Sequence, residues 1–109
     1  MEADELLTQL SELYKKKNED YGSSWTKTGE ILEILFEGKE IKINSIKDYN
    51  VLALLIRILD KICRFTNIYF ISKNMKINEK LVETASDTSV YWSMLACLVE
   101  KDDDNLSQG

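Results

Sequence analysis

The segment VLALLIRILDKICRFTNIYFI, residues 51–71, decides the fold class of this chain. At about 100° per residue, its apolar side chains occupy most of the circumference of a helix. A helix that is apolar on several sides is central and buried, so this segment predicts the core of the molecule. Ser45 or Asp48 is expected to cap its start, and its end is expected near Ser72. The chain contains no proline, which favours long helices and an all-α fold over a turn-rich β-sandwich.

The N-terminal segment predicts an amphipathic helix over residues 3–18, because its apolar side chains gather on one side of the helix. These side chains are Leu6, Leu7, Leu10, Leu13 and Tyr14. Gly22 then supplies a turn residue, and Ser23 or Ser24 supplies an N-cap for the next helix. We expect helix 3–18 to pack against the central helix as part of an antiparallel bundle.

Two further helices complete the predicted bundle. One covers residues 25–36 and stops at Gly38, although Gly29 costs about 1 kcal/mol relative to alanine in a helix interior. The other begins with Asn78 as N-cap and runs to about residue 100. Its expected core face consists of Leu81, Ala85, Thr88, Trp92, Leu95 and Val99. The segment 39–46, an insertion between the second and third helices, alternates apolar and polar residues and predicts a short hairpin or an irregular loop.

Length and charge restrict the function classes. The chain has 109 residues, a net charge of −5 and no histidine. We expect one helical domain over residues 1–100, followed by an acidic flexible tail over 101–109. The acidic balance argues against duplex nucleic acid as a partner, and the lack of histidine excludes a histidine-containing zinc site or general base. Charges interrupt the longest apolar stretch, so we expect no membrane contact. No signal peptide is visible, and the two cysteines suit a reducing cytosol. We therefore expect a cytoplasmic protein.

The central helix also has a stripe of charge. Arg57, Asp60, Lys61 and Arg64 fall within about 100° of its circumference. Three cations on one rigid helix suit a phosphate, because arginine offers two parallel donors and lysine a compact charge. We expect Arg57 and Arg64 to be the main phosphate contacts, while Asp60 could fix an arginine or hold a metal ion. The alternative is that the stripe is the solvent-facing side of an amphipathic helix.

Residues near the end of the first helix extend this candidate site. Lys17, Asp20 and Tyr21 continue the apolar face if the helix persists beyond Asn18, and a charge facing the interior requires a partner. The alternative is that the helix ends at Asn18 and these side chains point into water. Trp25 could stack on a nucleobase, although an aromatic residue at a helix start more commonly packs in a core.

The last predicted helix supplies acids. A ridge with a spacing of four residues contains Glu79, Glu83, Asp87 and Tyr91. These acids could pair with the basic stripe or bind Mg²⁺. Met94 and Leu98 extend the ridge, which favours cover by a partner subunit and a homo-oligomer formed partly by this helix. The alternative is that both residues cover the edge of an intramolecular core.

Three blocks of sequence together resemble a known family. They are KNEDYGSSW at residues 17–25, LIRILDKICR at 55–64, and ETASD at 83–87 with Tyr91 after it. In order and spacing they resemble the nucleotide modification associated domain 1 family, small helical proteins common in phages. The resemblance implies an association with nucleotides. It also implies site roles for Lys17, Asp20, Tyr21, Ser24, Arg57, Asp60, Lys61, Arg64, Glu83, Asp87 and Tyr91.

We therefore expect a phage-type protein that sequesters a nucleotide or a cyclic-nucleotide immune signal in a basic pocket, with a possible anti-defence role. To the residues named by the resemblance we add Trp25 as a ligand contact. No cofactor and no turnover are expected. The first alternative is a Mg²⁺-dependent nucleotide pyrophosphohydrolase, for which the acids of this sequence form an incomplete metal cluster. The second is a protein-interaction inhibitor or nucleic-acid mimic that uses the acidic surface.

Overall fold

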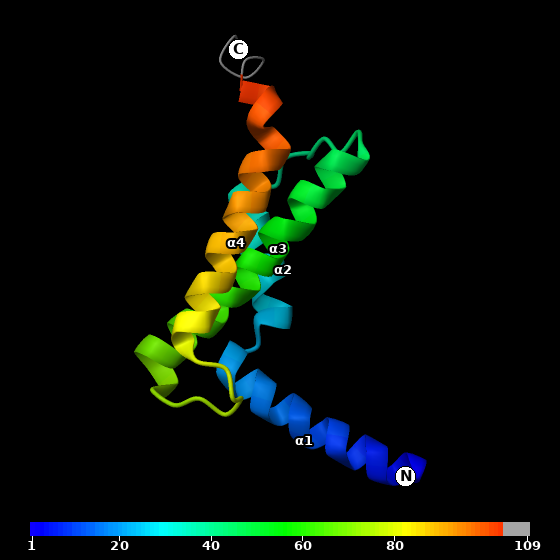
Figure 1. Cartoon of the computed structure of the whole chain (residues 1–109). Coiled ribbons are helices and arrows are strands. Elements are labelled where there is room, and N and C mark those ends of the chain that lie inside the picture. The colour runs from blue at the N-terminus through cyan, green and yellow to red at the C-terminus, as the bar shows by residue number, and fades with distance from the viewer. Residues whose placement is uncertain (104–109) are drawn as a thin grey trace.

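The computed structural model describes residues 1–103, and all regular secondary structure in this range is helical (Figure 1). The elements are α1 (Ala3–Tyr21), α2 (Ser24–Phe36), α3 (Ile46–Thr66), the π-helical turn η1 (Asn67–Ser72), α4 (Leu81–Val99) and the 3₁₀ turn η2 (Glu100–Asp102). The all-α prediction is confirmed. The sequence predicts either a short hairpin or an irregular loop between α2 and α3. Residues 39–45 form an irregular loop, since no strand occurs in the described part of the chain.

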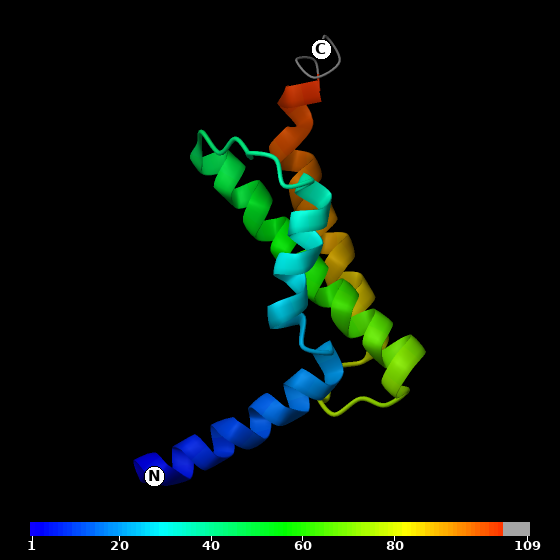
Figure 2. The same cartoon turned by 180° about the vertical axis from the view of Figure 1, so that it is seen from behind.

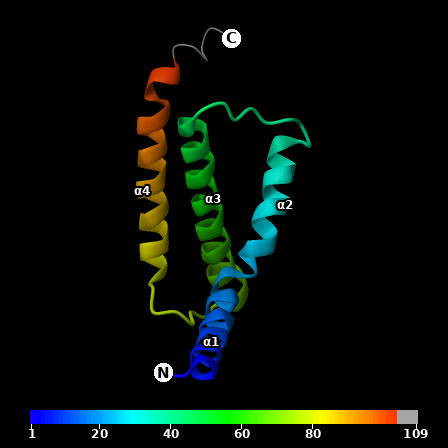
Figure 3. The same ribbon diagram turned by 90° about the vertical axis from the view of Figure 1, so that its right-hand side faces the viewer.

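Helices α3 and α4 form the body of the molecule. They run antiparallel and side by side (Figures 1 and 3). Their core contains Leu54 and Ile58 of α3 and Leu95 of α4, and Ile58 is 2% exposed. The prediction that residues 51–71 form the central helix is confirmed up to Thr66, and the last turns of that helix are π-helical rather than α-helical.

The face that α4 turns toward α3 differs from the predicted one. Leu95 is buried as expected, but Trp92 is 54% exposed, and Tyr91 packs against the core in its place. The buried Thr84 also faces α3, because it accepts a hydrogen bond from Arg64. The face of α4 toward α3 therefore includes a polar contact with Arg64, which a count of apolar residues could not predict.

Helix α1 projects from the body instead of packing along it (Figure 2). Its apolar face is exposed, with values of 45% for Leu6, 50% for Leu10 and 43% for Leu13. Only its C-terminal end reaches α3 and η1 (Figure 1). The prediction that α1 packs in an antiparallel bundle with α3 and α4 is wrong. α1 and α2 instead form one bent helix, which leaves three helical units rather than a four-helix bundle.

Two left-handed residues make the bend between α1 and α2. Gly22 has φ 59° and Ser23 has φ 61°. The Asn67 side chain packs at the same point, where its Nδ2 donates hydrogen bonds to the carbonyl oxygens of Glu19, at 2.6 Å, and Asp20, at 3.0 Å. A Cβ atom at residue 22 would lie 3.0 Å from Asn67 Cγ. Both the φ angle and the close approach of η1 therefore require glycine at this position.

The helix starts agree in part with their predicted caps. Ser45 caps α3 as predicted, because its Oγ accepts a hydrogen bond from the Asp48 amide at 3.1 Å. Asn78 is wrong as the N-cap of α4, which has Lys80 at that position. The segment before α4 is held in a non-helical path, since the Glu79 carbonyl accepts a hydrogen bond from Arg64.

The chain beyond α4 begins with an ordered turn. Asp102 in η2 pairs with Lys47 of α3 at 2.7 Å. The rest of the predicted acidic tail, residues 104–109, lies outside the described residues. Within residues 1–103, no helix combines the length and apolar character needed to cross a bilayer.

Candidate functional site

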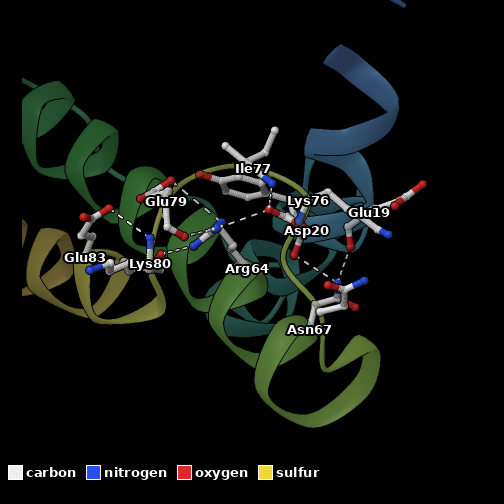
Figure 4. Close-up of polar contacts among 12 residues, drawn as sticks. Glu19, Asp20, Arg64, Asn67, Lys76, Ile77, Glu79, Lys80 and Glu83 are labelled. Carbon is white, nitrogen blue, oxygen red and sulfur yellow. Dashed lines mark hydrogen bonds and ion pairs between the residues drawn. The ribbon is translucent and has the colours of Figure 1, made fainter. Parts of the chain in front are cut away.

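The C-terminal half of α3 holds a fully buried arginine. Arg64 is 0% exposed, and its guanidinium donates to the Oγ1 of Thr84. It also donates to the Glu79 carbonyl at 2.8 Å and to Asp20 Oδ2 at 3.3 Å (Figure 4). Its Nε lies 3.9 Å from the Glu79 carboxylate. Arg64, which the sequence predicts to be a main phosphate contact, is therefore buried and ties together α1, α3 and the start of α4.

Asp20, at the end of α1, is the buried counter-charge of Arg64. It is also 0% exposed and accepts hydrogen bonds from the backbone amides of Lys76, at 2.7 Å, and Ile77, at 3.0 Å (Figure 4). Asp20 thus accepts hydrogen bonds from Arg64 and from two amides of the loop before α4. A buried ion pair of this kind costs about 3–5 kcal/mol when one partner is removed. We call this cluster of Asp20, Arg64 and Thr84 the buried hub.

A cavity of about 560 Å³ lies beside the buried hub. This volume is in the usual range for small-molecule sites, roughly 300–1,000 Å³. We call the cavity the junction pocket, because all four helices and the loop before α4 contribute to it. Its lining residues are Tyr14, Lys17, Asn18, Tyr21, Ser24, Trp25, Arg57, Asp60, Lys61, Ile77, Glu79 and Tyr91.

The junction pocket brings together most of the predicted site residues. Eight of them line it, namely Lys17, Tyr21, Ser24, Trp25, Arg57, Asp60, Lys61 and Tyr91. Asp20 and Arg64 lie in the buried hub and are closed off from a ligand by burial. Glu83 instead accepts a hydrogen bond from the Lys80 amide and caps the start of α4. Asp87 is half exposed and reaches the pocket residue Lys61 at 3.4 Å.

Four pocket residues were not among the predicted contacts. Tyr14 and Asn18 precede Tyr21 by seven and three residues, so the helical repeat of α1 could have placed both on the same face. Glu79 was recognised as an acid of the ridge but not as a pocket residue. Ile77 is in a loop, and nothing in the sequence pattern indicated its position.

Lys61 is held within a cluster of partners at the wall of the pocket. Its Nζ lies 3.1 Å from the Tyr21 hydroxyl, 3.2 Å from Glu79 and 3.4 Å from Asp87. Burial acts to lower the pKa of Lys61, but the hydrogen bond to Tyr21 and the charge of Glu79 outweigh it and raise the pKa above its usual value. Lys61 is therefore cationic throughout the physiological pH range and is occupied by neighbouring groups.

Lys17 and Arg57 differ from Lys61 in their surroundings. Neither forms an ion pair with any residue in the described range 1–103, and both side chains are exposed at the pocket. The acid nearest to Arg57 along the helix, Asp60, accepts a hydrogen bond from Thr28 of α2 at 2.9 Å. The pocket therefore offers two uncommitted cations in a chain whose net charge is −5.

Aromatic rings form the outer part of the junction pocket. Trp25 is 70% exposed, and its Nε1 donates to Asn18 Oδ1 at 3.2 Å. This hydrogen bond across the bend restrains the indole orientation while leaving the ring accessible. Tyr14, also exposed, belongs to the same pocket. Accessible rings beside cations suit a ligand with both a planar group and negative charge.

The acids of the pocket are already engaged. Asp60 accepts from Thr28, and Glu79 pairs with Lys61. Within residues 1–103, no group of three metal-ligating side chains is arranged to hold a metal ion. The Mg²⁺ of the hydrolase alternative stays a prediction.

Comparisons with protein-family models, curated proteins and solved structures found no match for this chain. The resemblance of the three sequence blocks to the nucleotide modification associated domain 1 family stays a prediction.

Proposed function

We propose that the chain binds a nucleotide or cyclic nucleotide in the junction pocket. The observation that supports this proposal is the presence of two uncommitted cations, Lys17 and Arg57, and an accessible indole, Trp25, on one cavity. In the proposal, Arg57 and Lys17 contact phosphate oxygens, and Trp25 stacks on the base. Lys17 replaces Arg64 as the second phosphate contact.

Charge and stacking each contribute to such a complex. A guanidinium donates two parallel hydrogen bonds to a phosphate, whereas an ammonium acts as a compact charge. Removing one hydrogen bond to a charged group costs about 1.5–3 kcal/mol. Stacking of a base on an aromatic ring contributes about 1–3 kcal/mol. A micromolar complex requires a binding free energy of about 8 kcal/mol in favour of the complex. Several of these contributions must act together to reach it.

The proposed role is sequestration rather than turnover. The pocket offers phosphate contacts and a stacking surface, and its acids are bound to neighbours. We extend the proposal to a phage-type protein that acts in the cytoplasm of its host and withholds a nucleotide signal from host defence. That extension is supported by the three sequence blocks. We also propose that the binding form is a homo-oligomer.

A thermal-shift screen with nucleoside phosphates and cyclic dinucleotides, with and without Mg²⁺, tests the ligand class. A ligand at about 100 times its Kd stabilises the protein by about 2.7 kcal/mol. We expect stabilisation by at least one phosphate-bearing ligand, its loss in Arg57→Gln and Lys17→Gln, and no change in Lys16→Gln. Lys16 is a matched control because it is the preceding lysine of α1 and does not line the pocket.

Recovery of the intact ligand after heat denaturation supports sequestration. Release of monophosphate or pyrophosphate, abolished by Asp60→Asn, would instead establish the hydrolase. If no phosphate-bearing compound stabilises the wild-type protein, the nucleotide proposal is wrong, and the interaction-inhibitor alternative gains support.

A further inference from the structure

Among residues 1–103, nothing covers the apolar face of α1. Leu6, Leu7, Leu10 and Leu13 are 43–67% exposed along one side of the projecting helix (Figures 1 and 2). The helix has 19 residues, somewhat more than the roughly 12–15 below which an isolated helix is marginal in water even with favourable residues. Most of the stability of a helix of this kind comes from burying its apolar face, so the exposed face requires cover.

The accessible surface of the chain is larger than that of a compact monomer of the same mass. Its accessible surface is 8402 Å², whereas a compact monomer of this mass exposes about 6,200 Å². The radius of gyration is 17.3 Å, against about 13 Å for a compact domain of this length. The excess area is larger than the roughly 800 Å² that each partner of a stable dimer buries. A second copy is therefore an occupant of sufficient size.

A groove between α3 and α4 is suited to receive a helix. Its volume is about 470 Å³, and its lining residues are Asn50, Ala53, Leu54, Arg57, Met94, Cys97 and Leu98. Most of these side chains are apolar, and Met94 is 47% exposed. A groove of this composition matches the recognition mode in which an amphipathic helix inserts side chains spaced three, four and seven residues apart. Leu6, Leu10 and Leu13 have that spacing.

The helix and the groove belong to one chain but cannot meet within it. The bend at Gly22 and Ser23 directs α1 away from the α3–α4 pair (Figures 1 and 2). Two copies that exchange their α1 helices cover both surfaces at once, which gives a closed symmetric pair. We infer that the apolar face of α1 lies in the α3–α4 groove of a second copy of this chain. The inference rests on the homo-oligomer of the proposed function and assigns its interface.

This arrangement places the interface beside the junction pocket. Arg57 lines both the pocket and the groove. Tyr14 and Lys17 extend from the same α1 helix whose apolar face enters the partner. Each pocket then opens next to the inserted helix of the other copy, and the second copy narrows its entrance.

Cross-linking tests the contact directly, because the groove contains a native thiol. Cys97 is exposed. Cys63 is buried. Its burial and, to a smaller extent, the charge of Asp60 raise the pKa of the Cys63 thiol, so the thiol stays protonated. We expect Leu10→Cys to form an intermolecular disulfide with Cys97 under mild oxidation, and to form none when Cys97→Ser is added. Thr8→Cys, on the opposite side of α1, is the matched control and should stay uncross-linked.

The mass in solution separates this inference from the broader proposal. Sedimentation or light scattering should give about twice 12.6 kDa for the wild-type protein and 12.6 kDa for the Leu6→Glu, Leu10→Glu double variant. Both leucines are exposed in the single chain, so circular dichroism of the variant should keep the helical signal of α3 and α4. Thr8→Glu should keep the wild-type mass.

Two outcomes would overturn the inference in different ways. A wild-type mass of 12.6 kDa at all concentrations would overturn the homo-oligomer together with its interface. The double variant could keep the oligomeric mass, or the introduced thiols could join each other rather than Cys97. Either result would overturn only the insertion of α1 into the groove. Ligand binding by the thermal-shift assay would be unaffected in the second case.

Discussion

Arg57 and Arg64 lie seven residues apart on the same side of α3, yet they occupy opposite environments. Arg64 is fully buried and bound to Asp20, Thr84 and the Glu79 carbonyl. Arg57 is exposed at a pocket and forms no ion pair within the described residues. The two ends of one charged stripe therefore differ in their surroundings. Its C-terminal part holds the fold together, and its middle part remains available to a ligand.

The largest expected effect is the loss of stability when the buried hub is broken. Arg64→Met should lower the free energy of unfolding by about 3–5 kcal/mol, because it leaves the Asp20 carboxylate buried without its counter-charge. Arg57→Met is the matched control and should change stability by less than about 0.5 kcal/mol, since the side chain is exposed. Urea unfolding at equal protein concentration measures both. Similar losses for the two variants would remove the distinction between them.

The reverse pattern is expected for binding. Arg57→Gln should weaken the affinity for a phosphate-bearing ligand by ten- to a hundredfold, or about 1.5–3 kcal/mol, with unfolding unchanged. Arg57→Lys should restore little, because a single ammonium cannot reproduce the paired donors of the guanidinium. Isothermal titration calorimetry measures the ratio. If Arg57→Lys keeps the full wild-type affinity, the charge alone determines ligand affinity and the paired donors of the guanidinium do not contribute.

Substitutions at two glycines test the bend between α1 and α2. Gly22→Ala should destabilise the protein by roughly 1–2 kcal/mol, the cost of a left-handed alanine. Contact of the new Cβ with Asn67 would add to this loss. Gly29 is in the middle of α2 with no atom within 4 Å of an added Cβ, so Gly29→Ala should instead stabilise by up to about 1 kcal/mol. Thermal unfolding compares them, and equal effects of the two substitutions would contradict the account of the bend.

The smallest effect is expected from pH acting on Lys61. Its folded-state pKa is raised above the unfolded one, so its contribution to stability is fully present below about pH 10 and is lost only as pH rises further. The difference in unfolding free energy between wild type and Lys61→Met should therefore be constant between about pH 6 and 9. A difference that changes near neutral pH would show that Lys61 is not held in its charged form.

Much of the architecture was predictable from residues 51–71. Their apolar circumference required a central helix, and the structure has one. Their charges predicted a site, and three of the charged residues, Arg57, Asp60 and Lys61, line one pocket. The separate fates of Arg57 and Arg64 were not predictable, because both have the same position on the helical wheel. Burial of Arg64 depends on Asp20 and on the loop before α4, which come together only in three dimensions.

The orientation of α1 shows a second limit of sequence analysis. The spacing of Leu6, Leu10 and Leu13 correctly indicates an apolar face, but amphipathicity says only that the face needs cover. It does not say whether the same chain provides that cover. Ser23 also adopts a left-handed conformation and contributes to directing the helix away from the body. Because residue 23 is a serine and not a glycine, the sequence did not indicate this conformation.

The measurement that tests the central claim most directly is a titration of the best-stabilising phosphate ligand into wild type and Arg57→Gln, with urea unfolding of both proteins. Arg57→Gln should lose at least about tenfold in affinity and keep the wild-type free energy of unfolding. Equal affinity in the two proteins would contradict this prediction. So would a loss of affinity accompanied by an equal loss of stability, because Arg57 would then belong to the fold, as Arg64 does.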